Sequence, residues 1–64
     1  MTLKCKLKEI LSDRNLDQRK LARAAGVSDS TITNMVNNKI PRLDNAQFVA
    51  KALMLTTDDI WEFN

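Results

Sequence analysis

Apolar residues recur at helical spacing along the chain, with charged residues between them. Near the start, Leu3, Leu7, Ile10 and Leu11 share one face of a helical wheel, and lysines and a glutamate occupy the other face. This pattern predicts an amphipathic helix that begins near Leu3 and ends within residues 13–15. On such a helix Cys5 lies about 160° from Leu7, so its thiol is expected to be half-exposed and without a role.

Two short helices are predicted on either side of Gly26. Asp17 can cap a helix over residues 18–25, and Gly26, which tolerates positive φ, can end it. Ser28 can cap the next helix, which ends at residues 37–38 with asparagine in a left-handed cap. Both helices are expected to contribute to one shared core, through Leu21, Ala25, Val27, Ile32, Met35 and Val36.

Two further helices complete the predicted fold. Pro41 sets a corner before a helix over residues 43–53, whose expected buried stripe is Leu43, Ala46, Ala50 and Leu53. Thr57, followed by two aspartates, is expected to cap a last short helix through Trp61. The sequence therefore predicts a compact all-α fold of five helices.

Composition limits the classes of protein to which the chain can belong. Its 64 residues are 44% hydrophobic and 28% charged, which is typical of a globular protein. A chain this short buries only about 60% of its unfolded surface, so we expect one core and a single domain over residues 1–64. No apolar run approaches a membrane span, and a charged N-terminal segment does not resemble a signal peptide. We expect a cytoplasmic protein with no membrane partner.

The inventory of reactive side chains argues against catalysis. There is one cysteine and no histidine, so no internal disulfide can form and the commonest metal ligand is absent. No nucleophile has an adjacent base. We therefore expect no enzyme activity, no cofactor, no metal and no small-molecule ligand.

Charge is distributed unevenly along the chain. Residues 1–23 carry seven basic and three acidic residues (+4), residues 24–55 three and two (+1), and residues 56–64 three acids alone (−3), which sums to +2. A polyanion would be attracted to the basic part, but a solvated charged helix face gives the same count. The charges alone do not decide between these interpretations.

Helix 28–37 is expected to project from the body at a large angle to its predecessor, because Ala22 permits close approach and Gly26 supplies the turn. Its outward side chains are short, polar and able to form hydrogen bonds, as contacts to base edges and phosphates require: Asp29, Ser30, Thr31, Thr33, Asn34 and Asn37. A helix of this kind fits the major groove of double-stranded DNA.

From about Leu7 to Trp61, the sequence resembles the lambda-repressor-like, Cro/CI-type (XRE) helix-turn-helix proteins. The resemblance rests on Pro41 before a helix ending in Leu53, on the Thr57-x-Asp59 opening of a fifth helix, and above all on one string, Gln18-x-x-Leu21-Ala22-x-x-Ala25-Gly26-Val27-Ser28-x-Ser30-Thr31-Ile32. It implies the five-helix fold with helices two and three as the DNA-binding motif, and a regulator of transcription as the function.

The resemblance also implies roles for individual residues. Those expected at base edges are Asp29, Ser30 and Asn34, to which we add Thr33 from its outward position. Those expected near the DNA backbone are Gln18, Thr31, Asn37, Lys39 and Arg42. Gln18 is expected to support the recognition helix as well as to anchor a phosphate.

Some positions keep two interpretations. Asp29 either accepts a hydrogen bond from a cytosine or only stabilises the positive end of its helix. Arg19, with its neighbours Lys20 and Arg23, either contacts phosphates or belongs to a solvated face. Met54 stands where the family commonly has glycine, which would cost about 1 kcal/mol unless the helix ends differently.

Phe48 and Phe63 suggest a partner. Phe48 points away from the predicted buried stripe of its helix, so we expect it to form, with Phe63, an exposed surface for a homodimer on DNA. An end effect or a shallow packing site would give the same exposure. The alternative function is a protein-interaction module, an adaptor or antagonist of another regulator that retains the same fold.

Overall fold

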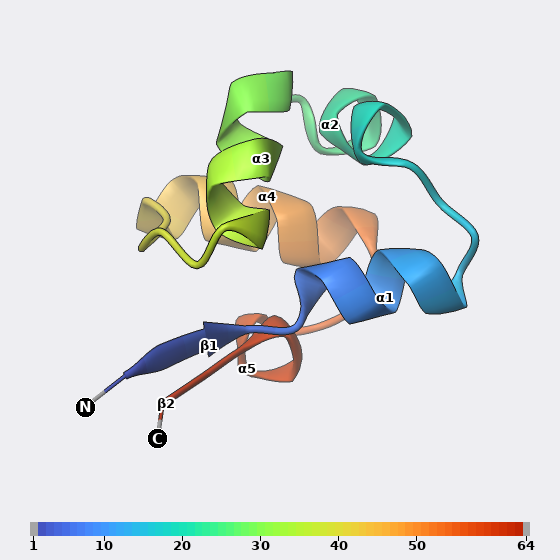
Figure 1. Ribbon diagram of the computed structural model, residues 1–64. Coiled ribbons are helices and arrows are strands. Elements are labelled where there is room, and N and C mark those ends of the chain that lie inside the picture. Colours follow the sequence, from blue (N-terminus) through green and yellow to red (C-terminus); the bar gives the residue numbers. More distant parts are fainter. Residues whose placement is uncertain (1, 64) are drawn as a thin grey trace.

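Helices form most of the part of the chain that the structure, a computed structural model, describes (residues 2–63; Figure 1). The elements in order are β1 (Leu3–Cys5), α1 (Leu7–Asp13), α2 (Gln18–Ala25), α3 (Asp29–Val36), α4 (Leu43–Ala52), α5 (Thr57–Ile60) and β2 (Trp61–Phe63). Figure 1 shows α3 in front of α4, α2 beside them, and the two strands together at one end of the molecule. Helices α2, α3 and α4 are the most closely associated group, because α2 contacts both of the others.

The core draws side chains from every helix. Among the fully buried ones, Leu7 comes from α1, Leu21 from α2, Ile32 from α3, Val49 from α4 and Ile60 from α5. The core residues predicted for α2 and α3 are confirmed, with Leu21, Ile32 and Met35 buried and Ala25, Val27 and Val36 partly buried against them. Burial of one face of α3 leaves its opposite face to solvent.

The expectation of an all-α fold is wrong at the two ends of the chain. Leu3–Cys5 is a strand that pairs antiparallel with Trp61–Phe63, so α1 begins only at Leu7 and α5 ends at Ile60. Leu3 and Cys5 are half-buried and Lys4 is exposed, a period of two that is as compatible with these residues as a helical period. The long-range pairing decides between them, and a Lys6–Glu62 ion pair of 3.0 Å adjoins it.

The predicted apolar stripe of α4 and cap of α5 are each wrong at one position. Leu43 is 73% exposed, because it is the first residue of α4 and lies beyond the core that Ala46, Val49 and Ala50 enter. The cap of α5 is Thr56 and not Thr57: its side chain accepts from the Asp59 N–H, and the Asp59 carboxylate accepts from the Thr56 N–H. This reciprocal pair is a capping box.

Helices α1 to α4 all end in the same way, with a residue in the left-handed region. Their φ angles lie between 54° and 73°, and in each case the next residue donates its N–H to the carbonyl five positions earlier, at 2.9–3.0 Å. This is the Schellman arrangement. The residues concerned are Asn15, Gly26, Asn38 and Met54. The predicted roles of Gly26 and Asn38 are confirmed, and Met54 occupies the conformation that penalises a side chain.

A side chain from the end of α1 holds the end of α4. The Arg14 Nη1 donates to the Leu53 carbonyl oxygen at 2.8 Å in a partly buried position. A cation at a helix C-terminus also interacts favourably with the negative end of the helix dipole. The sequence pattern gave no indication of this contact.

Cys5 and Trp61 face each other across the strand pair. Burial raises the pKa of the Cys5 thiol, against smaller opposing effects from the Leu7 backbone and the Trp61 side chain. The buried Trp61 Nε1 has no hydrogen-bond partner within residues 2–63. Within residues 2–63 no group of three His, Cys, Asp or Glu is placed to hold a metal ion. No helix in that range is long and apolar enough to cross a bilayer.

Candidate nucleic-acid interface

The solvent-facing side of α3 carries a row of short polar side chains. Ser30, Thr33 and Asn34 are exposed, whereas Ile32 and Met35 are buried. Because the buried pair packs in the core, the backbone of α3 is fixed relative to the body of the protein. The exposed row is therefore presented on a rigid support, as the sequence predicted.

The start of α3 is fixed by its own side chains. Ser28 Oγ accepts from the Thr31 N–H at 3.2 Å, which confirms the predicted cap. The Thr31 hydroxyl lies 2.8 Å from Ser28 Oγ and is only half-exposed. Part of the hydrogen-bonding capacity of Thr31 is thus used within the protein.

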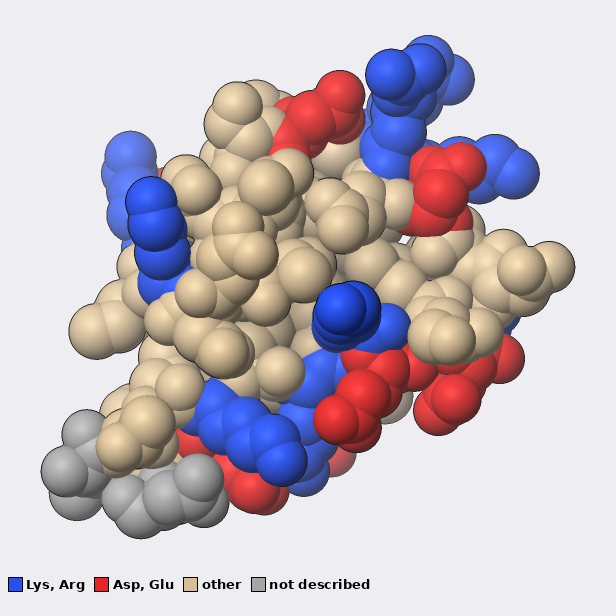
Figure 2. Space-filling view, in the orientation of Figure 1, with Lys and Arg blue, Asp and Glu red and all other residues tan. Residues whose placement is uncertain are grey.

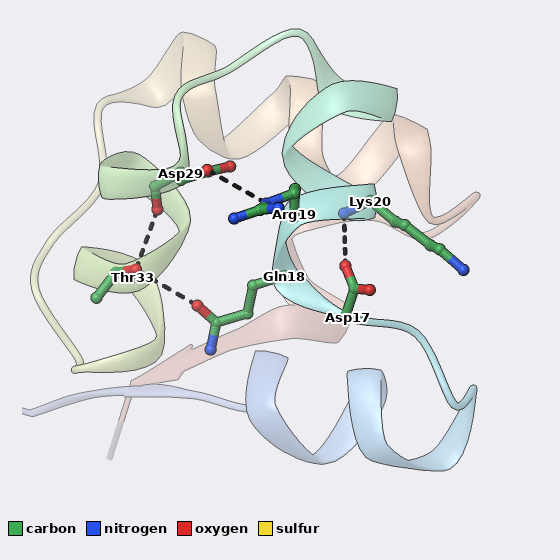
Figure 3. A network of polar contacts seen from close by, with 6 residues as sticks. All are labelled: Asp17, Gln18, Arg19, Lys20, Asp29 and Thr33. Carbon is green, nitrogen blue, oxygen red and sulfur yellow. Dashed lines mark hydrogen bonds and ion pairs between the residues drawn. The ribbon is translucent and has the colours of Figure 1, made fainter.

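Polar contacts join the start of α2 to the outer side of α3 (Figure 3). The Thr33 hydroxyl lies 3.1 Å from the Asp29 carbonyl oxygen and 3.4 Å from Gln18 Oε1, and its single proton is shared between these acceptors. Orienting Oε1 toward Thr33 leaves the Gln18 amino group directed elsewhere, with no protein acceptor within residues 2–63. An amide donor at the N-terminus of α2 suits a phosphate oxygen.

Arg19 and Asp29 bring opposite charges together at the same end. The Arg19 Nε and Asp29 Oδ2 are 4.0 Å apart, and both side chains are well exposed, at 75% and 65%. A pair this open contributes little to stability. Its consequence is electrostatic, because the arginine offsets the negative charge that Asp29 would present to DNA.

A cleft beside the second half of α3 collects several of the predicted residues. It has a volume of about 240 Å³, and its lining residues include Thr31, Asn34, Lys39, Arg42 and Asn45. Arg42 also pairs with Asp44 at 3.3 Å, whereas Lys39 has no acidic partner within residues 2–63. The cleft is polar and partly basic, which is suitable for a phosphate group.

Asn45 was missed by the sequence analysis. It is half-buried in the first turn of α4, and its side of that helix lines the cleft together with Asn34. The available signal was the polar side chain of Asn45 next to the apolar Ala46 in the first turn of this helix. Asn37, another predicted backbone contact, is exposed at the end of α3 but does not line the cleft.

The charged residues on this side lie around the row and not within it. Figure 2, in the orientation of Figure 1, shows uncharged residues over the upper left and middle of the face, with Lys and Arg side chains at its left and upper right margins and also near the centre and in the lower half of the view. Acidic side chains occur near the top and along the lower edge. Uncharged side chains with basic ones nearby suit a DNA surface in which bases lie between two phosphate backbones.

The two phenylalanines proposed for a dimer are both accessible. Phe48 is 50% exposed on α4 and Phe63 is 70% exposed on β2. Phe63 lines an apolar groove of about 230 Å³ with Leu3, Ile40 and Leu43, whereas Phe48 does not line it.

The comparison with known families agrees with this geometry. The model of the Cro/C1-type HTH DNA-binding domain matches residues 6–64. The chain belongs to this family. DNA binding in transcription regulation is thus the general function of this Cro/C1-type domain. No curated protein matches the chain.

Proposed function

We propose that this Cro/C1-type domain binds double-stranded DNA in a sequence-specific manner, with α2 and α3 as the helix-turn-helix and α3 in the major groove. The observation that carries the proposal is the row of exposed short polar side chains on a helix whose other face is buried. Side chains of this kind donate to and accept from base edges without adding repulsive charge. The proposed base contacts are Ser30, Thr33 and Asn34 of this row, together with Asp29, whose negative charge Arg19 offsets.

The DNA backbone contacts are assigned to groups around this row. Gln18 offers its amide donor, Lys39 offers an ammonium group with no acidic partner within residues 2–63, and Arg42 and Thr31 line the same cleft as Lys39. Arg19 and Asn37 complete the set. Asp29 keeps two possible roles. It either accepts a hydrogen bond from a cytosine or, as an acid in the first turn of α3, stabilises the positive end of that helix.

We propose further that the domain regulates transcription, as a repressor or Cro-like protein, by binding as a homodimer to a two-fold symmetric site. Half-sites on one face of a duplex are about 34 Å apart, and the largest dimension of the domain is 31 Å, so neighbouring copies would be close enough to touch. Exposed Phe48 and Phe63 are the candidate contacts. The groove lined by Leu3, Ile40 and Leu43 makes Phe63 the better supported of the two.

The test begins with selection of bound duplexes from a random-sequence library, followed by fluorescence anisotropy. The expected result is a palindromic consensus, bound with a salt dependence of log K of about −0.9 per phosphate neutralised. Asn34→Ala is expected to weaken binding to the selected duplex by about five- to one-hundredfold, the effect of losing one good base contact. Gln47→Ala, which removes an exposed amide from α4 instead, is the matched control and should bind as the wild type does.

Two outcomes would contradict the proposal. Equal, weak binding to every duplex would favour the alternative, a protein-interaction module with this fold. Equal losses of affinity in Asn34→Ala and Gln47→Ala would show that α3 does not make the base contacts.

The dimer has its own test. Sedimentation that shows only monomers at high micromolar concentration, with and without DNA, would refute the two-fold contact. Comparing Phe63→Ser with Phe48→Ser identifies which phenylalanine lies in the contact.

A further inference from the structure

The end of α3 is attached to the first strand by one side chain. Asn38 Oδ1 accepts a hydrogen bond from the backbone N–H of Cys5 at 3.1 Å, across 33 positions of sequence. Figure 1 shows β1 below the lower end of α3. Cys5 is itself anchored, because it packs against the core and pairs with Trp61 on the other strand.

Asn38 also fixes the backbone on both sides of it. With φ of 65° it reverses the chain after α3, its N–H donates to the Met35 carbonyl, and the N–H of Lys39 donates to the Asn34 carbonyl at 3.0 Å. Asn34 is a proposed base contact and Lys39 a proposed phosphate contact. The Asn38 side chain therefore connects the strand pair to the junction between these two groups.

We propose that Asn38 is a positioning residue for DNA recognition: through Cys5 it holds the end of α3 and the start of the following loop against β1. The inference rests on the proposed function, since it assumes that α3 contacts DNA. Asn38 itself need not touch the duplex. Without the contact, Asn34 and Lys39 would be presented with a wider range of orientations, which lowers the affinity for a specific site.

Capping alone does not account for Asn38. Glycine adopts the left-handed conformation without a steric penalty, and it would end α3 at least as well. Asn15 provides the comparison inside the same chain, because it ends α1 with φ of 54° in the same Schellman arrangement. Within residues 2–63 the Asn15 side chain makes no hydrogen bond. The bond to a distant strand is what distinguishes Asn38.

The test compares Asn38→Gly with Asn15→Gly. Both substitutions keep the cap and relieve the same backbone strain, but only Asn38→Gly removes the acceptor for Cys5. Three quantities are measured for each variant of the 64-residue chain: the thermal midpoint, hydrogen exchange of the Cys5 amide by NMR, and anisotropy with the selected duplex and with a random duplex.

Asn38→Gly is expected to speed exchange of the Cys5 amide and to weaken binding to the selected duplex by about two- to tenfold, the range of one hydrogen bond. Its thermal midpoint should stay close to that of the wild type, because the loss of the hydrogen bond is offset by the relief of backbone strain. Binding to the random duplex should be unchanged. Asn15→Gly should leave the Cys5 amide and both affinities as they are.

The outcomes separate this inference from the proposed function. A wild type that selects no duplex overturns the proposed function and this inference with it. If the wild type selects a duplex and Asn38→Gly binds it as tightly as Asn15→Gly does, the inference alone fails. Unchanged exchange of the Cys5 amide in Asn38→Gly also overturns it, because the contact would then not hold the strand.

Discussion

Replacing Met54 with glycine is expected to stabilise the protein. Met54 has φ of 59°, a conformation in which a Cβ crowds the following carbonyl oxygen at a cost of about 1–2 kcal/mol. Its side chain is 92% exposed, so removing it sacrifices little packing. The capping bonds, from Met54 to Lys51 and from Leu55 to Ala50, are made by backbone atoms and persist in the variant.

The expected gain is smaller than the strain relieved. Glycine has more conformational freedom in the unfolded chain, which offsets roughly 0.5–1 kcal/mol, so the net increase in the free energy of unfolding is about 0.5–1 kcal/mol. For a domain of this size that corresponds to a rise of about 2–8 °C in the thermal midpoint. Circular dichroism during heating and urea denaturation both measure it.

Two variants check the mechanism. Met54→Ala shortens the side chain but keeps the Cβ, so its stability should stay close to that of the wild type. Gly26→Ala is the reverse change: apart from the local backbone, no described atom lies within 4 Å of the added Cβ, but φ is +73°, so a loss of about 1 kcal/mol is expected from backbone strain alone. The reasoning is refuted if Met54→Gly is no more stable than Met54→Ala.

Other contacts give predictions of known sign. Arg14→Ala removes the bond to the Leu53 carbonyl and should lower the free energy of unfolding by about 1 kcal/mol, and an unchanged urea midpoint would show that this bond contributes nothing. Ser28→Ala removes the cap of α3 and should cost about 1 kcal/mol, whereas Ser30→Ala, two residues further on, should not destabilise the protein. Lys6 lowers the pKa of Glu62 below its ordinary 4.5, and the Thr56 backbone and hydroxyl lower that of Asp59 below its ordinary 3.8. Both carboxylates therefore stabilise the fold fully above about pH 4.5 and lose this effect as the pH falls through their lowered pKa values. Glu62→Gln should flatten that part of the stability curve in an acid titration, and a curve identical to the wild type's would argue against the pair.

The middle of the fold could be predicted from the sequence because its signals are local. Asp17 and Ser28 cap helices whose first N–H groups lie within three residues of them, and Gly26 ends a helix through the conformation of a single residue. The buried face of α3 follows from the spacing of Ile32 and Met35. The exposed row used for the proposed base contacts is the other side of the same helix, so both follow from one pattern.

The two ends could not be predicted in the same way, since their structure depends on residues far apart in the sequence. Nothing near Leu3 indicates that Phe63 lies opposite it, and Leu3 also fits a helical stripe with Leu7. The Asn38 contact with Cys5 and the position of Asn45 in the cleft likewise require the assembled fold. Leu43 was misplaced because periodicity gives the direction of a side chain and not the extent of the core along the helix axis.

The pairing of β1 with β2 has a consequence for the order of folding. It joins nearly the two extremes of the described chain, so forming it requires closure of a loop that contains every helix. The helices need no such closure, so we expect the strands to pair only after the helices have associated.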